Sequence, residues 1–167
     1  SDSLVGNLYK GRVVNVLPGM QAAFLDIGLS KNAFLYVDDA LHHHLEKQPK
    51  IKPSIDEILS PGDEMIVQIM KDPLGGKGAR VTTHYSLPGR LLVYMPRADY
   101  IGISKKIEAE AERNRLRALA EQLLAPGEGV ILRTNAEGEQ PAAFGADLQR
   151  LRARWETVVR QGDELAA

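Results

Sequence analysis

Residues 75–97 of the 167-residue chain read GGKGARVTTHYSLPGRLLVYMPR. Glycines and Lys77 lead into a run of β-type residues, a Pro-Gly pair then predicts a turn, and a second apolar strand follows. The stretch therefore predicts the end of one β unit and the start of another. It is also basic, because the segment Gly75–Ile107 has six Lys and Arg residues and one acidic residue, Asp99. A positive segment with glycines, which let a backbone approach a ligand, indicates a polyanionic partner.

The composition is ordinary for a soluble globular protein. A length of 167 residues with a net charge of −1 suits one domain or two small ones. No apolar run approaches the roughly 20 residues that cross a bilayer, and no secretory signal is visible. The lack of cysteine excludes disulfides and Cys-ligated metals, which favours a cytoplasmic setting. Because the chain begins at Ser1, just before a strand-like segment, we expect it to be part of a longer protein.

The first half is predicted to be rich in β-strands. Turn signals such as Leu17-Pro18-Gly19 and Pro61-Gly62-Asp63 separate short apolar runs. The runs lie at Leu8–Val16, Ala22–Ile27, Ala33–Val37, Glu64–Met70 and Ala79–Ser86. The polar residues 38–60 are expected to form a long loop with one helical turn. Five short strands with one long connection are typical of an OB-type β barrel.

The second half is predicted to be a small α+β domain. Strands are expected at Leu91–Met95, Tyr100–Ser104 and Gly129–Thr134, and helices at Glu108–Leu124 and from about Pro141 to Arg160. Ser104 is the expected N-cap of the first helix. In the second helix an apolar stripe opposes Arg150, Arg152 and Arg154, which we expect to be solvated or to pack on a neighbouring domain. We assign residues 1–86 to the barrel and 87–167 to the α+β domain.

Phe24 and Phe34 are the first candidates for a binding surface. They are the only phenylalanines in the first hundred residues, and each lies in a predicted strand. Exposed aromatic rings on an OB sheet stack on bases, which stabilises binding by about 1–3 kcal/mol per base. Periodicity alone slightly favours a core position for both rings. Lys77 could contact phosphates, or it could be a solvated surface charge.

Motifs along almost the whole chain resemble one known family. GNLYKGRV (6–13), AAFLDIG (22–28), NAFLYVDD (32–39) and PGDEMIVQIMKDP (61–73) look like an S1-type OB domain. Together with GGKGARVTT, SLPGRLLVYMP, GISKKI and GVILRT, they resemble the RNase E/RNase G family of bacterial endoribonucleases, which act in rRNA processing and mRNA decay. The resemblance implies single-stranded RNA as the partner, bound by an S1-type domain and by a "5′ sensor" domain that recognises a monophosphorylated end. It also favours RNA contact by Phe24, Phe34 and Lys77.

The resemblance further implies a pocket for the 5′-phosphate, lined by Gly89, Val93, Arg133 and Thr134. An arginine offers a planar fork of donors to phosphate oxygens, a threonine hydroxyl and backbone N–H groups add donors, and a glycine permits close approach. Without the family, Arg133 would be interpreted as part of a strand-end salt bridge. Lys105 and Lys106 match a basic pair that lies near the same RNA end in the family.

The remaining motifs predict no catalytic residues. His42, His43 and His44 are adjacent on a loop and lack partners at metal-ligand spacing, and GGKGAR lacks the spacing of a Walker A loop. In the family, two aspartates of a separate domain hold the Mg²⁺ that activates water. We therefore expect no metal or cofactor and no RNA cleavage in this part, with Mg²⁺ needed by the longer enzyme.

Two other functions stay open. The chain could be a sequence-tolerant RNA-binding factor of the translation or transcription type, without end sensing. It could also be an assembly module whose basic segment contacts another subunit. Because family enzymes form oligomers through other parts, we expect this chain to be a monomer or a weak dimer.

Overall fold

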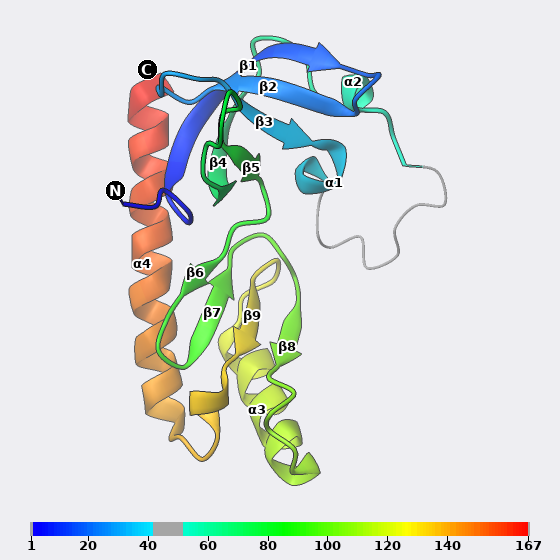
Figure 1. The fold of residues 1–167 in the computed structure, drawn as a ribbon. Helices are drawn as coiled ribbons and strands as arrows, with labels where there is room; N and C mark the ends of the chain where they lie inside the picture. Colours follow the sequence, from blue (N-terminus) through cyan, green and yellow to red (C-terminus); the bar gives the residue numbers. More distant parts are fainter. Residues whose placement is uncertain (1, 42–51, 167) are drawn as a thin grey trace. The chain divides into compact units, whose positions relative to one another are not determined.

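A computed structural model describes residues 2–41 and 52–166 of the chain, and His42, His43 and His44 lie outside the described residues. The chain divides into two compact units, which can be followed in Figure 1. The first unit extends to Tyr85 and includes the chain from Gln161 onward, and the second unit is Ser86–Arg160. Residues after Arg160 thus group with the first unit, whereas the sequence-based assignment gave them to the second.

The first unit is a closed five-stranded barrel with the order β1-β2-β3-β5-β4. Its strands are β1 (Leu8–Leu17), β2 (Ala22–Asp26), β3 (Ala33–Tyr36), β4 (Glu64–Lys71) and β5 (Arg80–Thr82), and the short helices α1 (Val37–Ala40) and α2 (Ile55–Ile58) lie between β3 and β4. The register of β1 on β2 shifts between Val13 and Asn15. Such a bulge bends a strand and helps a small sheet to close. The predicted barrel is confirmed.

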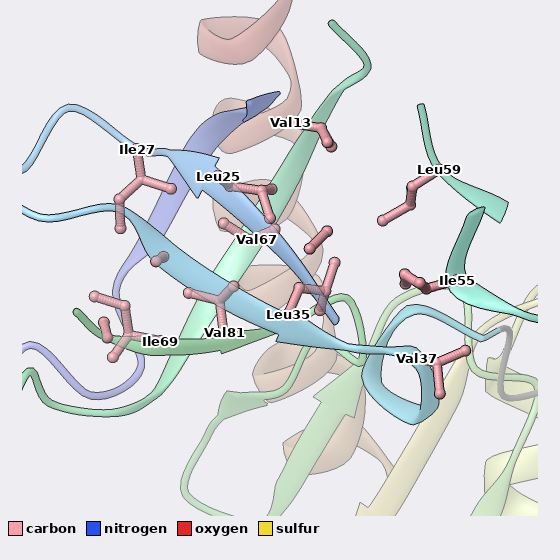
Figure 2. Close-up of a cluster of buried hydrophobic side chains, with 13 residues drawn as sticks. Val13, Leu25, Ile27, Leu35, Val37, Ile55, Leu59, Val67, Ile69 and Val81 are labelled. Atoms are coloured by element: carbon pink, nitrogen blue, oxygen red, sulfur yellow. The ribbon is translucent and has the colours of Figure 1, made fainter. Parts of the chain in front are cut away.

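Alternate residues of the strands fill the barrel interior, as Figure 2 shows for Leu25, Leu35 and Val67. Leu25 and Leu35 are fully buried, whereas their neighbours Phe24 and Phe34 are only partly buried. A fully buried leucine or valine stabilises the fold by about 1.5–3 kcal/mol. Because side chains alternate between the two faces of a strand, this burial fixes the outward direction of Phe24 and Phe34.

The second unit is a four-stranded sheet with the order β6-β7-β9-β8 (Figure 1). Its elements are β6 (Leu87–Pro88), β7 (Leu92–Met95), β8 (Ile101–Ile103), α3 (Glu110–Leu123), β9 (Gly129–Leu132), the 3-10 turn η1 (Thr134–Ala136) and the part of α4 (Pro141–Ala166) that ends at Arg160. Leu92 and Leu132 of the sheet, Leu116 of α3 and Leu148 of α4 line one small apolar gap. Both helices therefore pack on the same face of the sheet. The predicted α+β part is confirmed, although the two-residue strand β6 was expected to be a turn.

The expected N-cap of α3 is wrong. The helix begins at Glu110 after Ala109, which makes no side-chain cap. The Ser104 hydroxyl instead lies 2.9 Å from the Thr134 hydroxyl. Arg113 holds the intervening segment in a non-helical form, because its guanidinium donates to the carbonyls of Ser104 and Ile107 at 2.8 and 2.9 Å. This frees Ser104 to face the turn that follows β9.

The expectation for the arginines of the last helix is wrong for Arg152, which packs within its own unit. Arg152 donates to a Glu128 carboxylate oxygen and to the carbonyl of Leu123, both at 2.8 Å. Glu128 also accepts a hydrogen bond from the Tyr94 hydroxyl. Burial raises the pKa of Glu128, but the hydrogen bonds from Arg152 and Tyr94 outweigh it and lower the pKa to about 2. Burial, reinforced by Glu128, raises the pKa of Tyr94. The cluster ties α4 to the segment before β9.

Candidate nucleic-acid interface

The outward face of β2 and β3 carries three aromatic rings. Phe24 pairs directly with Phe34 across the two strands, and Tyr36 pairs with Ala22 on the same face. The centroids of Phe34 and Tyr36 are 5.4 Å apart with an edge-to-face angle of 79°. All three rings are partly buried and lie outside the barrel core. The core position that periodicity slightly favoured for the two phenylalanines is therefore wrong.

These rings line a groove of about 500 Å³. Lys31 and Lys77 also line it, and none of its lining residues is acidic. The Lys77 ammonium lies 5.5 Å from the Phe34 ring centroid, a cation–π contact that places a positive charge beside the ring. The Lys31 ammonium donates to the carbonyl of Gly75 at 3.0 Å. The groove thus combines stacking surfaces with cations that can contact a phosphate backbone.

The glycines before β5 shape this groove through contacts within the chain. A Cβ on Gly78 would lie 2.0 Å from the carbonyl oxygen of Asn32. Only glycine lets the loop that carries Lys77 pack this closely on the loop between β2 and β3. Gly78 thus serves a close contact between two loops of the protein.

Tyr36 is a groove residue that sequence reasoning missed. The guanidinium carbon of Arg80 lies 4.9 Å from its ring centroid. Arg80 is in turn held by an ion pair of 3.0 Å with the buried carboxylate of Asp39. The alternation in Ala33–Tyr36, with Leu35 buried, was the signal that could have found it, because Tyr36 shares the face of Phe34.

In the second unit, Gly89 lies against a buried carboxylate. Asp147 of α4 accepts hydrogen bonds from the backbone N–H groups of Arg90, Leu91 and Leu92 at 3.3, 2.9 and 3.3 Å. A Cβ on Gly89 would lie 2.6 Å from an Asp147 oxygen. Burial raises the pKa of Asp147, but the hydrogen bonds from Leu91 and Arg90, with help from Arg150, hold it below its usual value. Gly89 is therefore needed for this contact, which the sequence did not indicate.

Arg133 and Thr134 lie beside this turn. The Arg133 guanidinium donates to the carbonyl of Gly89 at 2.7 Å, and its backbone N–H donates to the carbonyl of Leu91 at 2.8 Å. Among the residues that the structure describes, no carboxylate pairs with Arg133. The structure thus brings Gly89, Arg133 and Thr134 together, with Ser104 as an added hydroxyl that sequence reasoning did not assign to the site.

The other three candidates of the second unit lie around this cluster. Val93 pairs with Pro88 on one side and Ile131 on the other, one row of the sheet away from Arg133. Lys105 and Lys106 are exposed, and the Lys106 backbone N–H donates to the Ser104 hydroxyl at 3.2 Å. Two further cations are therefore close in sequence to a hydroxyl of the cluster. The cluster itself offers the Arg133 guanidinium and the hydroxyls of Ser104 and Thr134 to an anion, and the exposed Lys105 and Lys106 follow Ser104 directly in the chain.

The described ranges 2–41 and 52–166 contain neither a metal-binding cluster nor a membrane-spanning helix. No three His, Asp or Glu side chains there are grouped in a way that could hold a metal ion. No helix in these ranges is both long and apolar enough to cross a membrane.

Both units are similar to proteins of the same family. Residues 86–167 match the model of the ribonuclease E/G family. Over 95% of its length, the chain is 46% identical to "Ribonuclease G" of Haemophilus influenzae and 45% identical to "Ribonuclease G" of Escherichia coli K12. The chain belongs to the ribonuclease E/G family. It is also 43% identical over 94% of its length to "Ribonuclease E" of Synechocystis, another member of the ribonuclease E/G family.

The chain spans only part of these ribonucleases. It covers 33% of each of the two ribonuclease G proteins and 23% of the Synechocystis ribonuclease E. The similarity to family members extends over both the barrel and the sheet domain, because it includes nearly all of this chain.

Proposed function

We propose that this chain is the RNA-binding and 5′-end-sensing part of a cytoplasmic ribonuclease E/G-type endoribonuclease that acts in RNA processing and decay. Cleavage of the RNA phosphodiester bond, and the Mg²⁺ that it requires, belong to other parts of the longer enzyme. Family membership supports the reaction class. The cluster around Arg133 supports the sensing of an RNA end.

The observation that carries the proposal is the aromatic and basic groove of the barrel. Phe24, Phe34 and Tyr36 share one face, and Lys77 lies over one of the rings. Flat aromatic surfaces accept any base, and neighbouring cations follow the phosphate backbone, so this combination suits single-stranded RNA without a fixed sequence. The expected loss on removing one stacking ring is about 1–3 kcal/mol of binding free energy.

The second unit is proposed to hold the terminal 5′-monophosphate. Arg133 and Thr134 would donate directly to its oxygens, with Lys105 and Lys106 supplying charge and Val93 contacting the nucleotide. Gly89 would act through its carbonyl, which orients Arg133. Binding of one RNA by both units would position the strand for a distant catalytic site.

A second candidate is RNA binding without end sensing. It is favoured by one observation: the N–H groups of Arg90, Leu91 and Leu92, next to Gly89, are already bonded to Asp147. These amides are therefore occupied before any phosphate arrives. On this alternative the groove alone determines affinity.

The test compares one short RNA with a 5′-monophosphate and with a 5′-hydroxyl, measured by fluorescence anisotropy. Wild-type protein is expected to prefer the phosphate, and Arg133→Ala is expected to lose that preference. Phe34→Ala should lower the affinity for both RNAs by the same factor, which makes it the matched control for the groove. Equal affinity of the wild type for the two RNAs would support the second candidate. The purified chain with Mg²⁺ is expected to leave the RNA uncut, and cleavage that survives repurification would contradict the division of labour proposed here.

A further inference from the structure

The outer face of the second sheet carries an apolar row across all four strands. Strand register pairs Pro88 with Val93, Val93 with Ile131, and Ile131 with Gly102. The neighbouring residues Leu92 and Leu132 are buried against the helices, so the row points away from them. Ile131 is 37% exposed, which is high for an isoleucine in an inner strand.

Tyr100 extends this row at its β8 end. A Cβ on Gly102 would lie 2.9 Å from the Cε2 atom of the Tyr100 ring and 3.1 Å from its hydroxyl oxygen. The ring therefore lies over Gly102, on the face that Ile131 shares, and only glycine leaves room for it. Tyr100 is nevertheless 49% exposed, so part of the ring remains open to solvent. The result is an aromatic and aliphatic surface made of Tyr100, Ile131 and Val93.

The anion cluster forms the next row along the same strands. Arg133 lies two residues beyond Ile131, and Ser104 lies two residues beyond Gly102. Two residues of a strand span about 6.6 Å. This separation is comparable with the distance from a nucleotide's 5′-phosphate, across its ribose, to its base. A phosphate held by Arg133 and Thr134 would thus place its own base over the apolar row.

We propose that Tyr100 and Ile131 bind the base of the 5′-terminal nucleotide. This inference rests on the proposed function, since it takes the phosphate position from it. The base stacks on the open part of the Tyr100 ring and contacts Ile131, and Val93 continues the same row on the other side of Ile131. The ligand of the second unit is then a nucleoside 5′-monophosphate end, and a bare phosphate group is an incomplete ligand. Because every base has a flat face, the site accepts all four.

The test uses three short RNAs of one sequence: 5′-phosphorylated, 5′-phosphorylated with an abasic first nucleotide, and 5′-hydroxyl. Each is titrated into wild type, Tyr100→Ala and Tyr100→Phe, with Val14→Ala as a control at an exposed apolar residue of the barrel. Removing the first base is expected to weaken wild-type binding about tenfold. The Tyr100→Ala variant should bind the intact phosphorylated RNA more weakly than the wild type by a similar factor. Its affinity should be the same for the intact and the abasic phosphorylated RNAs. Tyr100→Phe and Val14→Ala should behave as wild type.

The outcomes separate the two claims. A wild type that prefers the 5′-phosphate but binds the abasic RNA within twofold of the intact RNA would overturn this inference and leave the proposed function standing. A wild type without any preference for the 5′-phosphate would overturn both. The wild-type comparison of the intact and abasic RNAs needs no substitution, so the test does not depend on the folding of Tyr100→Ala.

Discussion

Removing the carboxylate of Asp147 should destabilise the second unit strongly. The side chain is only 4% exposed and accepts the N–H groups of Arg90, Leu91 and Leu92. Leu91 and Leu92 are buried, so water cannot replace the lost acceptor at their amides. A buried amide without a partner costs about 1–3 kcal/mol, and two of them predict a loss of about 2–6 kcal/mol for Asp147→Ala.

Urea unfolding, followed by the fluorescence of the single tryptophan, measures this loss, because Trp155 is a buried residue of the second unit. Arg150→Ala is the matched control, since it removes only the exposed partner of the same carboxylate and should cost less than about 1 kcal/mol. Asp147→Ala should also reduce the preference for 5′-phosphorylated RNA, because the turn at Gly89 orients Arg133. A loss of stability below about 1 kcal/mol in Asp147→Ala would refute the reasoning, since it would mean that the amides find other acceptors at little cost.

Three further substitutions test other parts of the structure. Gly89→Ala would place a Cβ 2.6 Å from Asp147 and should lower the free energy of unfolding, measured in urea, by about 1–3 kcal/mol. Gly145→Ala is the control, because a Cβ there meets no atom within 4 Å, and this substitution should be neutral or slightly stabilising. The pKa of Glu128 falls from 4.5 to about 2 on folding, so its contribution to stability is present above pH 4.5 and is lost as the pH falls toward 2. Glu128→Gln should therefore weaken the pH dependence of unfolding in this range, and an unchanged profile would contradict the assignment. Lys77→Ala should lower the salt dependence of RNA affinity by about 0.7 in log–log slope if it contacts one phosphate of a single strand, and an unchanged slope would exclude that contact.

The period-two pattern of the sequence was enough to predict the barrel. Buried residues lie two positions apart within a strand, as Ala23 and Leu25 do in β2 and Ala33 and Leu35 do in β3, and turn signals separate the runs. The same pattern did not decide the placement of Phe24 and Phe34, because an aromatic ring satisfies the apolar periodicity of either face. Burial of the small Ala23 and Ala33 shows that the interior lies on the other side.

The second unit was harder to predict because its decisive contacts join residues far apart in sequence. Asp147 lies more than fifty residues after the amides that it accepts, at separations of 55 to 57 residues. On its own helix it resembles any acidic surface residue. Ser104 had the local features of a helix cap, but Arg113 fixes its carbonyl and the hydroxyl turns to Thr134. In both cases a tertiary contact overrode a local signal.

The central claim is that one chain carries two RNA-contacting surfaces with different chemistry. Amide and side-chain NMR of the labelled chain, titrated with a short 5′-phosphorylated RNA and with its 5′-hydroxyl counterpart, tests it most directly. Both RNAs should shift the resonances of Phe24, Phe34 and Lys77, and only the phosphorylated RNA should shift those of Arg133 and Thr134. Identical shifts with the two RNAs, or no shifts at the barrel rings, would contradict the account.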